Sequence, residues 1–284
     1  MKRIILPTDF SGNAYNAIRY AIRLFRGEEC TFYLLHTYIP AVYHAEYILY
    51  SPGQIGLGDP YQVSSMERLE KLREQLEHEF PDPVHNFILY SAHSSLVDEI
   101  LEIVERERAD LVIMGTQGAT GAKEIFFGTN TVNLIERANC PVIAVPSNVG
   151  HELPEEILFP TDYEIVYGED RLNILLHLAK IHGSHINVMH ISPGNGLSGP
   201  QLENKRELEA ILGGFPHRFH DLPDQEVLAG IADFKTRKKV HLLVMIQNKH
   251  TFLERLFIEP IIKKTAFHLD LPFLVFPVGN RSVE

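Results

Sequence analysis

The chain has 284 residues, of which 45% are hydrophobic and 22% charged, and its formal net charge is −11. This length and composition favour two globular domains with sizeable cores. The negative charge argues against a nucleic-acid partner, and no apolar run approaches the ~18–20 residues of a membrane span, so neither partner is expected. Cys30 and Cys140 each lie beside an apolar run and are predicted to be free, buried thiols.

The start of the chain, MKRIILPTDF, combines two basic residues with a short apolar run that acidic Asp9 follows closely. A secretory signal has a longer apolar region and a small-residue cleavage site. The start therefore predicts a first strand, and we expect a cytoplasmic protein.

Short β-branched runs alternate with helical patterns along the first half of the chain. Helical spacing places apolar residues on one face of two segments. These residues are Met66, Leu69, Leu72 and Leu76, and then Leu96, Ile100, Ile103 and Val104. Strands are predicted near 3–7, 30–37, 84–91, 110–114 and 142–146, and helices near 12–26, 64–79, 94–108 and 129–138.

This alternation predicts a doubly wound α/β fold with a five-stranded parallel sheet covered on both faces. Ligands of such sheets bind beyond the carboxyl ends of the strands, where the strand order reverses. Residues 38–62 form a long connection with five tyrosines. A connection of this length is expected to be either a lid over a ligand or a surface that packs on the other half.

A glycine-rich loop, GTQGATGAKEIFFGTNT, spans residues 115–131 between the strand DLVIM and a predicted helix. Glycines let an anion approach the main chain, and a helix N-terminus favours phosphate. Thr129 or Asn130 is expected to cap the helix, and Lys123 offers a positive charge. The loop lacks the spacing of a Walker A motif, and no GxGxxG follows the first strand. On the loop alone, a plain connector remains the alternative.

The spacing Gly115-x2-Gly118-x9-Gly128-Thr129, together with Asp9 after the first strand, resembles the universal stress protein family. That family belongs to the nucleotide-binding α-hydrolase-like folds. The stretches ILPTDFS, LLHTY and CPVIAVP support the resemblance, which covers nearly the whole chain as a tandem pair.

The resemblance implies that an adenine nucleotide, ATP alone or with magnesium, binds in the first half. It places Asp9 beside the adenosine, the Thr37 backbone at the adenine edge, and the glycines at the ribose and phosphates. The implied nucleotide-binding residues are Asp9, Thr37, Met114, Gly115, Gly118, Gly128, Thr129 and Asn130. No catalytic residue and no metal ligand is predicted.

The second half repeats the first. Pro7-Thr8-Asp9 recurs 153 residues later as Pro160-Thr161-Asp162, and Pro141 recurs 131 residues later as Pro272. This order predicts an internal duplication with domains at 1–148 and 149–284. Family members pair the last strands of two units, so PVIAVP and PFLVFP are expected to pair within one chain as a pseudo-dimer. Whether two chains form a homodimer is left open.

The second copy has lost the glycine loop. Aligned on the prolines, Gly115, Gly118, Gly128 and Thr129 correspond to Ile246, Lys249, Glu259 and Pro260. A glutamate in place of Gly128 opposes an anion, so we expect no ATP in this half. The spacing of His182 and His185, near His177 and His190, suggests either a metal site or ordinary surface and core histidines.

Three functions follow from these patterns. The first is a regulatory protein of the stress response whose conformation depends on bound ATP. The second is a slow ATPase or a self-phosphorylating enzyme, against which stands the lack of a general base or arginine finger near the loop. The third is a scaffold in which the nucleotide is purely structural.

Overall fold

The computed structural model describes residues 1–38, 60–116, 128–150, 152–191, 196–222, 227–247 and 271–277. The first half comprises β1 (Lys2–Pro7), α1 (Gly12–Leu24), β2 (Cys30–Thr37), α3 (Pro60–Glu79), β3 (His85–Ala92), α4 (Leu96–Glu107), β4 (Leu111–Gly115), α5 (Thr129–Arg137) and β5 (Val142–Val145). The second half comprises β6 (Glu156–Pro160), α6 (Glu169–His182), β7 (His185–Ile191), α7 (Gly199–Leu212), β8 (His217–Leu222), α8 (Val227–Arg237), β9 (Leu242–Ile246) and β10 (Phe273–Phe276).

The strands and helices predicted for the first half are all present, and their ends shift by a few residues. The largest shift is at α3, which begins at Pro60, four residues before the predicted start. Proline at a first helical position lacks only an N–H that has no helical partner there. Among the described residues, no helix combines the length and the apolar character needed to cross a membrane.

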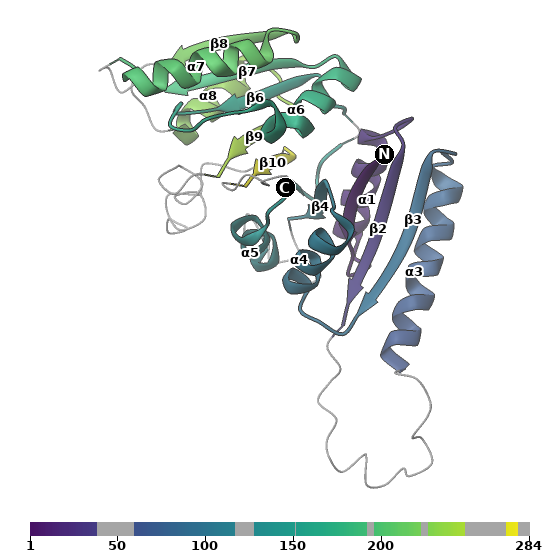
Figure 1. The fold of residues 1–284 in the computed structure, drawn as a ribbon. Coiled ribbons are helices and arrows are strands. Elements are labelled where there is room, and N and C mark those ends of the chain that lie inside the picture. Colours follow the sequence, from purple (N-terminus) through teal and green to yellow (C-terminus); the bar gives the residue numbers. More distant parts are fainter. Residues whose placement is uncertain are drawn as a thin grey trace, which may run out of the picture.

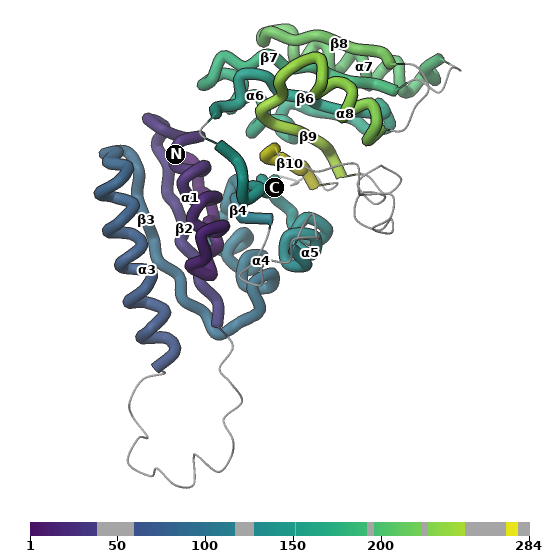
Figure 2. Tube along the Cα trace, turned by 180° about the vertical axis from the view of Figure 1, so that it is seen from behind, coloured from purple at the N-terminus to yellow at the C-terminus, as the bar shows by residue number. Residues whose placement is uncertain are grey.

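All ten strands form one sheet in the order β3-β2-β1-β4-β5-β10-β9-β6-β7-β8. Pairing is parallel inside each half, and the halves join through an antiparallel pair of β5 and β10 in which Ile143 lies opposite Leu274. β10 lies beside the first half in both views of the molecule (Figures 1 and 2). The predicted doubly wound fold and the pairing of the last strands within one chain are confirmed.

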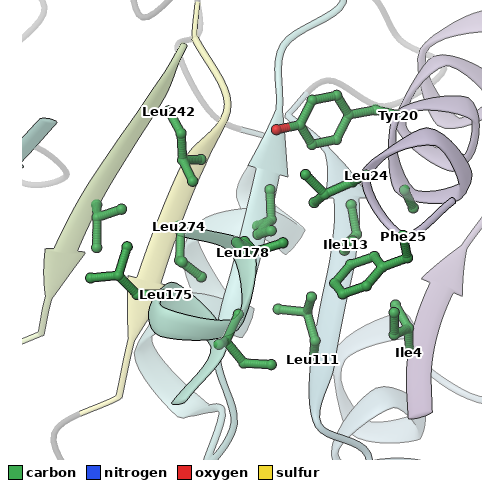
Figure 3. Packing of buried hydrophobic residues seen from close by; sticks show 14 of the residues in the cluster. Ile4, Tyr20, Leu24, Phe25, Leu111, Ile113, Leu175, Leu178, Leu242 and Leu274 are labelled. Atoms are coloured by element: carbon green, nitrogen blue, oxygen red, sulfur yellow. The ribbon is translucent and has the colours of Figure 1, made fainter. Parts of the chain in front are cut away.

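Each face of the sheet carries a core that runs through both halves. Residues of α1, α3, α6 and α7 contribute to one core, and residues of α4, α5 and α8 to the other. Figure 3 shows Leu24 and Phe25, at the end of α1, in one cluster with Leu175 and Leu178 of α6 and Leu274 of β10. The two halves therefore share their hydrophobic core in addition to their sheet.

The predicted helix faces are largely confirmed. Leu69, Leu72 and Leu76 are buried, whereas Met66 is only partly buried against the core. On α4 the burial includes Ile100, Ile103, Val104 and also Val97, while Leu96 is partly buried. Both cysteines are free and buried, as predicted.

In the second half, a network of polar side chains connects β6, β7 and β8 near the amino end of β6. The side chain of Asn187, fully buried on β7, donates to Glu156 Oε2 at 2.9 Å and accepts from His220 Nε2 at 3.1 Å. Lys238 Nζ lies 2.8 Å from the same Glu156 oxygen, and His185 Nδ1 lies 3.6 Å from it. In the first half, polar contacts at the amino ends involve Arg3, Tyr33, Tyr90 and Glu107.

Replacing Leu274 by alanine is expected to lower the free energy of unfolding by about 2–5 kcal/mol, because the change leaves a cavity in the core shared by the halves. Leu274 is fully buried on β10. The measurement is urea unfolding monitored by circular dichroism. The control is Leu202→Ala on α7, where the side chain is exposed and the expected change is within about 0.5 kcal/mol. Equal losses of stability in the two variants would contradict the placement of Leu274 in the core that the two halves share.

The second half is expected to lose stability as the pH falls. Burial lowers the pKa of His185, and nearby Lys238, His217 and Arg218 lower it further, against the opposite effect of Glu156. Burial, Arg218, Lys238 and His185 likewise lower the pKa of His220, against Asp221.

Because an unfolded histidine titrates near 6.5, the unfolded chain binds more protons than the folded one below that pH. The free energy of unfolding should therefore fall as the pH drops below about 6.5 and through the lower folded pKa values. Urea midpoints between pH 7.5 and 5 test this. His220→Gln, which keeps an N–H donor for Asn187, should have a shallower pH dependence, and an unchanged slope would refute the role of His220.

Candidate functional site

The structure brings the predicted residues of β1, β2 and β4 to one edge of the sheet. β1 pairs with β2 on one side and with β4 on the other, so the strand order reverses between β1 and β4. Asp9 follows β1, Thr37 ends β2, and Met114 and Gly115 end β4. In doubly wound folds this reversal point is where ligands bind.

The turn after β1 is held in a left-handed conformation by side-chain hydrogen bonds. Phe10 has φ +61°, and its N–H donates to Thr8 Oγ1 at 2.9 Å. Asp9 Oδ1 accepts from Ser11 N–H at 2.9 Å, and Ser11 Oγ in turn caps α1 by accepting from Ala14 N–H. A left-handed phenylalanine is costly unless its surroundings enforce it. The turn therefore fixes the position of the Asp9 carboxylate at the edge of the sheet.

The ring of Phe10 lies between two basic side chains. The His36 ring centroid is 4.6 Å away, and the guanidinium of Arg68 on α3 is 3.9 Å from the Phe10 ring centroid. His36 Nδ1 also forms a 2.8 Å hydrogen bond with Ser65 Oγ. Burial and the charge of Arg68 lower the pKa of His36, while Asp9 opposes that effect. This arrangement favours a neutral His36 in a packing and positioning role.

The two ends of the glycine loop meet at the end of β4. Gly128 N–H donates to the carbonyl of Thr116, and Thr116 N–H donates to the Val145 carbonyl at 3.1 Å. Thr131 Oγ1 donates to the Gly115 carbonyl at 3.2 Å. These bonds connect the base of the loop to β5 and to the start of α5. Residues 117–127, among them Gly118 and Lys123, lie outside the described residues.

The prediction that Thr129 or Asn130 caps α5 is wrong. Gly128 is the N-cap, with extended backbone angles and no side-chain cap, and its carbonyl accepts from Thr131 and Val132 N–H. Thr129 and Asn130 are instead the first two helical residues, and both are exposed. Within the described segments, no carboxylate caps this helix N-terminus, which carries positive partial charge.

Gly115 also lies in close contact with α1, a contact the sequence did not reveal. A Cβ at this position would lie 2.5 Å from Nδ2 of Asn13, in the first turn of α1, and 3.3 Å from the Asn13 carbonyl. The glycine thus lets α1 approach the end of β4. The sequence did not predict a role for Asn13, because its contact with Gly115 joins residues about a hundred positions apart.

The turn after β6 repeats the turn after β1. Tyr163 has φ +59°, and its N–H donates to Thr161 Oγ1 at 3.1 Å. Asp162 Oδ1 accepts from Glu164 N–H at 3.0 Å, and the His190 ring lies 4.9 Å from that of Tyr163. The repeat of Pro-Thr-Asp in the sequence is therefore matched by a repeat of the same turn in the backbone.

The segment that follows β6 in the second half makes its own side-chain contacts. Tyr167 is almost fully buried, and its hydroxyl forms a short hydrogen bond with Thr161 Oγ1. Glu207 of α7 accepts from the N–H groups of Tyr167 and Gly168 at the start of α6. Ile246, the counterpart of Gly115, ends β9 and is buried. Lys249, Glu259 and Pro260 lie outside the described residues.

The histidines considered for a metal site have other contacts. His182 Nε2 donates to the Leu24 carbonyl at 2.9 Å, and His190 Nδ1 donates to the Thr161 carbonyl at 3.0 Å. His177 and His185 each lie near a glutamate, Glu28 and Glu156 respectively. Within the described part of the chain, no three histidine, cysteine, aspartate or glutamate side chains are placed to hold a metal ion.

The long tyrosine-rich connection is described only at its two ends. Tyr38 stacks between Tyr61, at 6.4 Å between ring centroids, and His93, at 5.8 Å. The ends of the connection therefore lie together at the carboxyl edge of β2 and β3. Residues 39–59 lie outside the described residues, so the lid and packing hypotheses both stay predictions.

A model of the universal stress protein family matches residues 1–146, more than half of the chain. The chain belongs to the universal stress protein family. Its first half thus carries the glycine loop and the Asp9 turn within the matched region. The expectation drawn from the spaced glycines is confirmed at the level of the family.

Two curated universal stress proteins of Methanocaldococcus jannaschii resemble half of the chain. MJ0531 is 28% identical over 151 residues, which is 51% of this chain and 81% of the relative. MJ0577 is 29% identical over 154 residues, which is 51% of this chain and 94% of the relative. A universal stress protein structure from Archaeoglobus fulgidus matches 98% of both chains with a TM-score of 0.67 and 17% identity, which supports the tandem fold.

Gly115→Ala is expected to destabilise this universal stress protein by about 1–3 kcal/mol, because the new methyl group collides with Asn13. Chemical denaturation measures the change. Gly150→Ala is the matched control, since a Cβ there has open space within 4 Å. Adding Asn13→Ala to Gly115→Ala should restore part of the loss. Failure of the double variant to recover any stability would rule out the collision as the cause.

Proposed function

We propose that the first half of this universal stress protein binds ATP and that binding regulates the conformation of the protein in a stress response. The observation that carries the proposal is the convergence of two features at one reversal point of the sheet. The Asp9 turn ends β1, and the closed base of the glycine loop ends the neighbouring β4. A carboxylate suits ribose hydroxyls, and glycine amides beside a helix N-terminus suit phosphates.

In this proposal, Asp9 and the Thr37 backbone contact the adenosine, and Met114 and Gly115 line the approach to the ribose. The phosphates lie against Gly118, Gly128 and the start of α5. The exposed side chains of Thr129 and Asn130 and the uncapped helix N-terminus support that placement. Magnesium would bind through the phosphates, because the groups proposed beside them, Gly118, Gly128, Thr129 and Asn130, carry no carboxylate.

The proposal confines the nucleotide to the first of two domains, 1–148 and 149–284. The boundary falls between β5 and β6, which end at Val145 and begin at Glu156. Ile246 supports the loss of binding in the second domain, because a bulky buried side chain ends β9 where Gly115 ends β4 in the first half. The cytoplasmic location stays a prediction of the sequence, as does the choice between a monomer and a homodimer.

Slow hydrolysis or self-phosphorylation and a purely structural nucleotide are the alternatives. The guanidinium of Arg68 lies over the ring of Phe10, next to Asp9. Steady turnover that disappears with Asp9→Asn would favour the enzyme. Binding without any change in conformation would favour the structural role.

The test is calorimetric titration of ATP with magnesium into matched variants. Asp9→Asn keeps the oxygen that accepts from Ser11 but removes the charge, so ATP affinity should fall about 10- to 100-fold. Asp162→Asn makes the same change in the second half and should leave affinity unaltered. Gly128→Glu places a charge at the phosphates and should abolish binding.

One ATP per chain with this pattern supports the proposal. Equal sensitivity to Asp9→Asn and Asp162→Asn would contradict the confinement of ATP to the first half. Folded wild-type protein that binds no ATP would refute the proposed function itself.

A further inference from the structure

Helix α1 contacts the base of the glycine loop with its first turn. Asn13 occupies the space that a side chain at Gly115 would need, at 2.5 Å from the position of the missing Cβ. One turn further, Asn16 Nδ2 donates to the carbonyl of Pro146 at 3.2 Å. Pro146 follows Val145, whose carbonyl accepts from Thr116 N–H at the loop base. The start of α1 thus contacts the carboxyl ends of both β4 and β5, where hydrogen bonds hold the base of the loop.

The last turn of the same helix contacts the second half. The Leu24 carbonyl accepts from His182 Nε2 of α6 at 2.9 Å, and the ring of Phe25 stacks on His177 at 6.2 Å between centroids. His177 Nε2 also lies 3.2 Å from Glu28. Burial lowers the pKa of both histidines, which favours their neutral forms. Figure 3 shows Tyr20 and Leu24 of α1 in one apolar cluster with Leu175 and Leu178 of α6.

The middle of α1 gives the helix little freedom to bend or to absorb a local shift. Ala17, Ile18 and Ala21 are fully buried between its two ends. Small residues place the helix backbone close to the strands, and close-packed interiors respond to displacement by shifting whole elements. A shift at Asn13 is therefore transmitted along the helix to the Leu24 carbonyl.

We infer that α1 couples nucleotide binding at the base of the loop, where Gly115, Thr116 and Gly128 lie, to α6, so that the second half responds to nucleotide bound in the first. The inference rests on the proposed function for the identity of the ligand. Nucleotide at the loop base changes the position of Gly115 against Asn13, and the rigid helix carries that change to the contact between Leu24 and His182. Coupling of this kind is reciprocal, so the α6 contact must also change the affinity for nucleotide.

The reciprocity gives the first arm of the experiment, which uses the full chain and ATP with magnesium at pH 7.5. His182→Ala removes the donor to Leu24 and is expected to weaken ATP binding about 3- to 10-fold, because the loop base loses support from α1. His182→Gln restores an N–H donor and should recover much of the affinity. His217→Ala is the control, since His217 bonds the carbonyl of Phe215 in the turn before β8, at the far edge of the sheet.

The second arm is hydrogen exchange of the wild-type protein with and without ATP. Slower exchange in α6, with α7 and α8 unchanged, supports the coupling. The inference is overturned if ATP binds the wild type without changing exchange in α6 and His182→Ala binds ATP as tightly as the wild type. That result leaves the proposed function intact. Absence of ATP binding to folded wild type overturns both, so the two failures are distinguishable.

Discussion

The antiparallel pairing of β5 with β10 is the constraint on which the rest of the molecule depends. Each strand is four residues long and fully buried, and either one alone would leave a bare apolar edge on a five-stranded sheet. Pairing them covers both edges at once and forms the ten-stranded sheet. The same pairing brings α1 and α6 onto one face, where their apolar residues share a core.

Parallel topology then decides where chemistry is possible. Because the strand order reverses between β1 and β4, the loops that leave their carboxyl ends are expected to diverge there. In the first half the Asp9 turn and Gly115 lie at this point. In the second half the corresponding turn is retained, but Ile246 ends β9 in place of the glycine, and Glu207 accepts from two N–H groups at the start of α6. Duplication has thus kept the turn in both halves and the glycine in one.

This asymmetry gives the second half a role other than binding the same ligand. Its contact with α1 uses two histidines whose partners lie in the first half, at Leu24 and Glu28. A second half that retains the fold, shares a core with its neighbour and lacks the counterpart of Gly115 is suited to respond to the first half. The α1 contact is the physical connection through which such a response would pass.

The sequence by itself determined the local elements, the duplication and the motif at the loop. Periodic apolar spacing dictates buried helix faces such as that of Leu69 and Leu72, and Gly115-x2-Gly118-x9-Gly128 identified the family, because both signals are contained in short stretches. The repeated Pro-Thr-Asp also indicated two equivalent turns. Local backbone rules act over a few residues, so they can be read without the fold.

Tertiary structure decided what depends on distant partners. The role of Gly115 against Asn13, the α6 contact of His182 and the burial of Tyr167 each join segments that local patterns do not connect. The N-cap of α5 is Gly128 and neither Thr129 nor Asn130, because the hydrogen bond between Gly128 and Thr116 sets where the helix begins. Periodicity shows which face of an element is buried, but only packing decides which residue of another element lies against it.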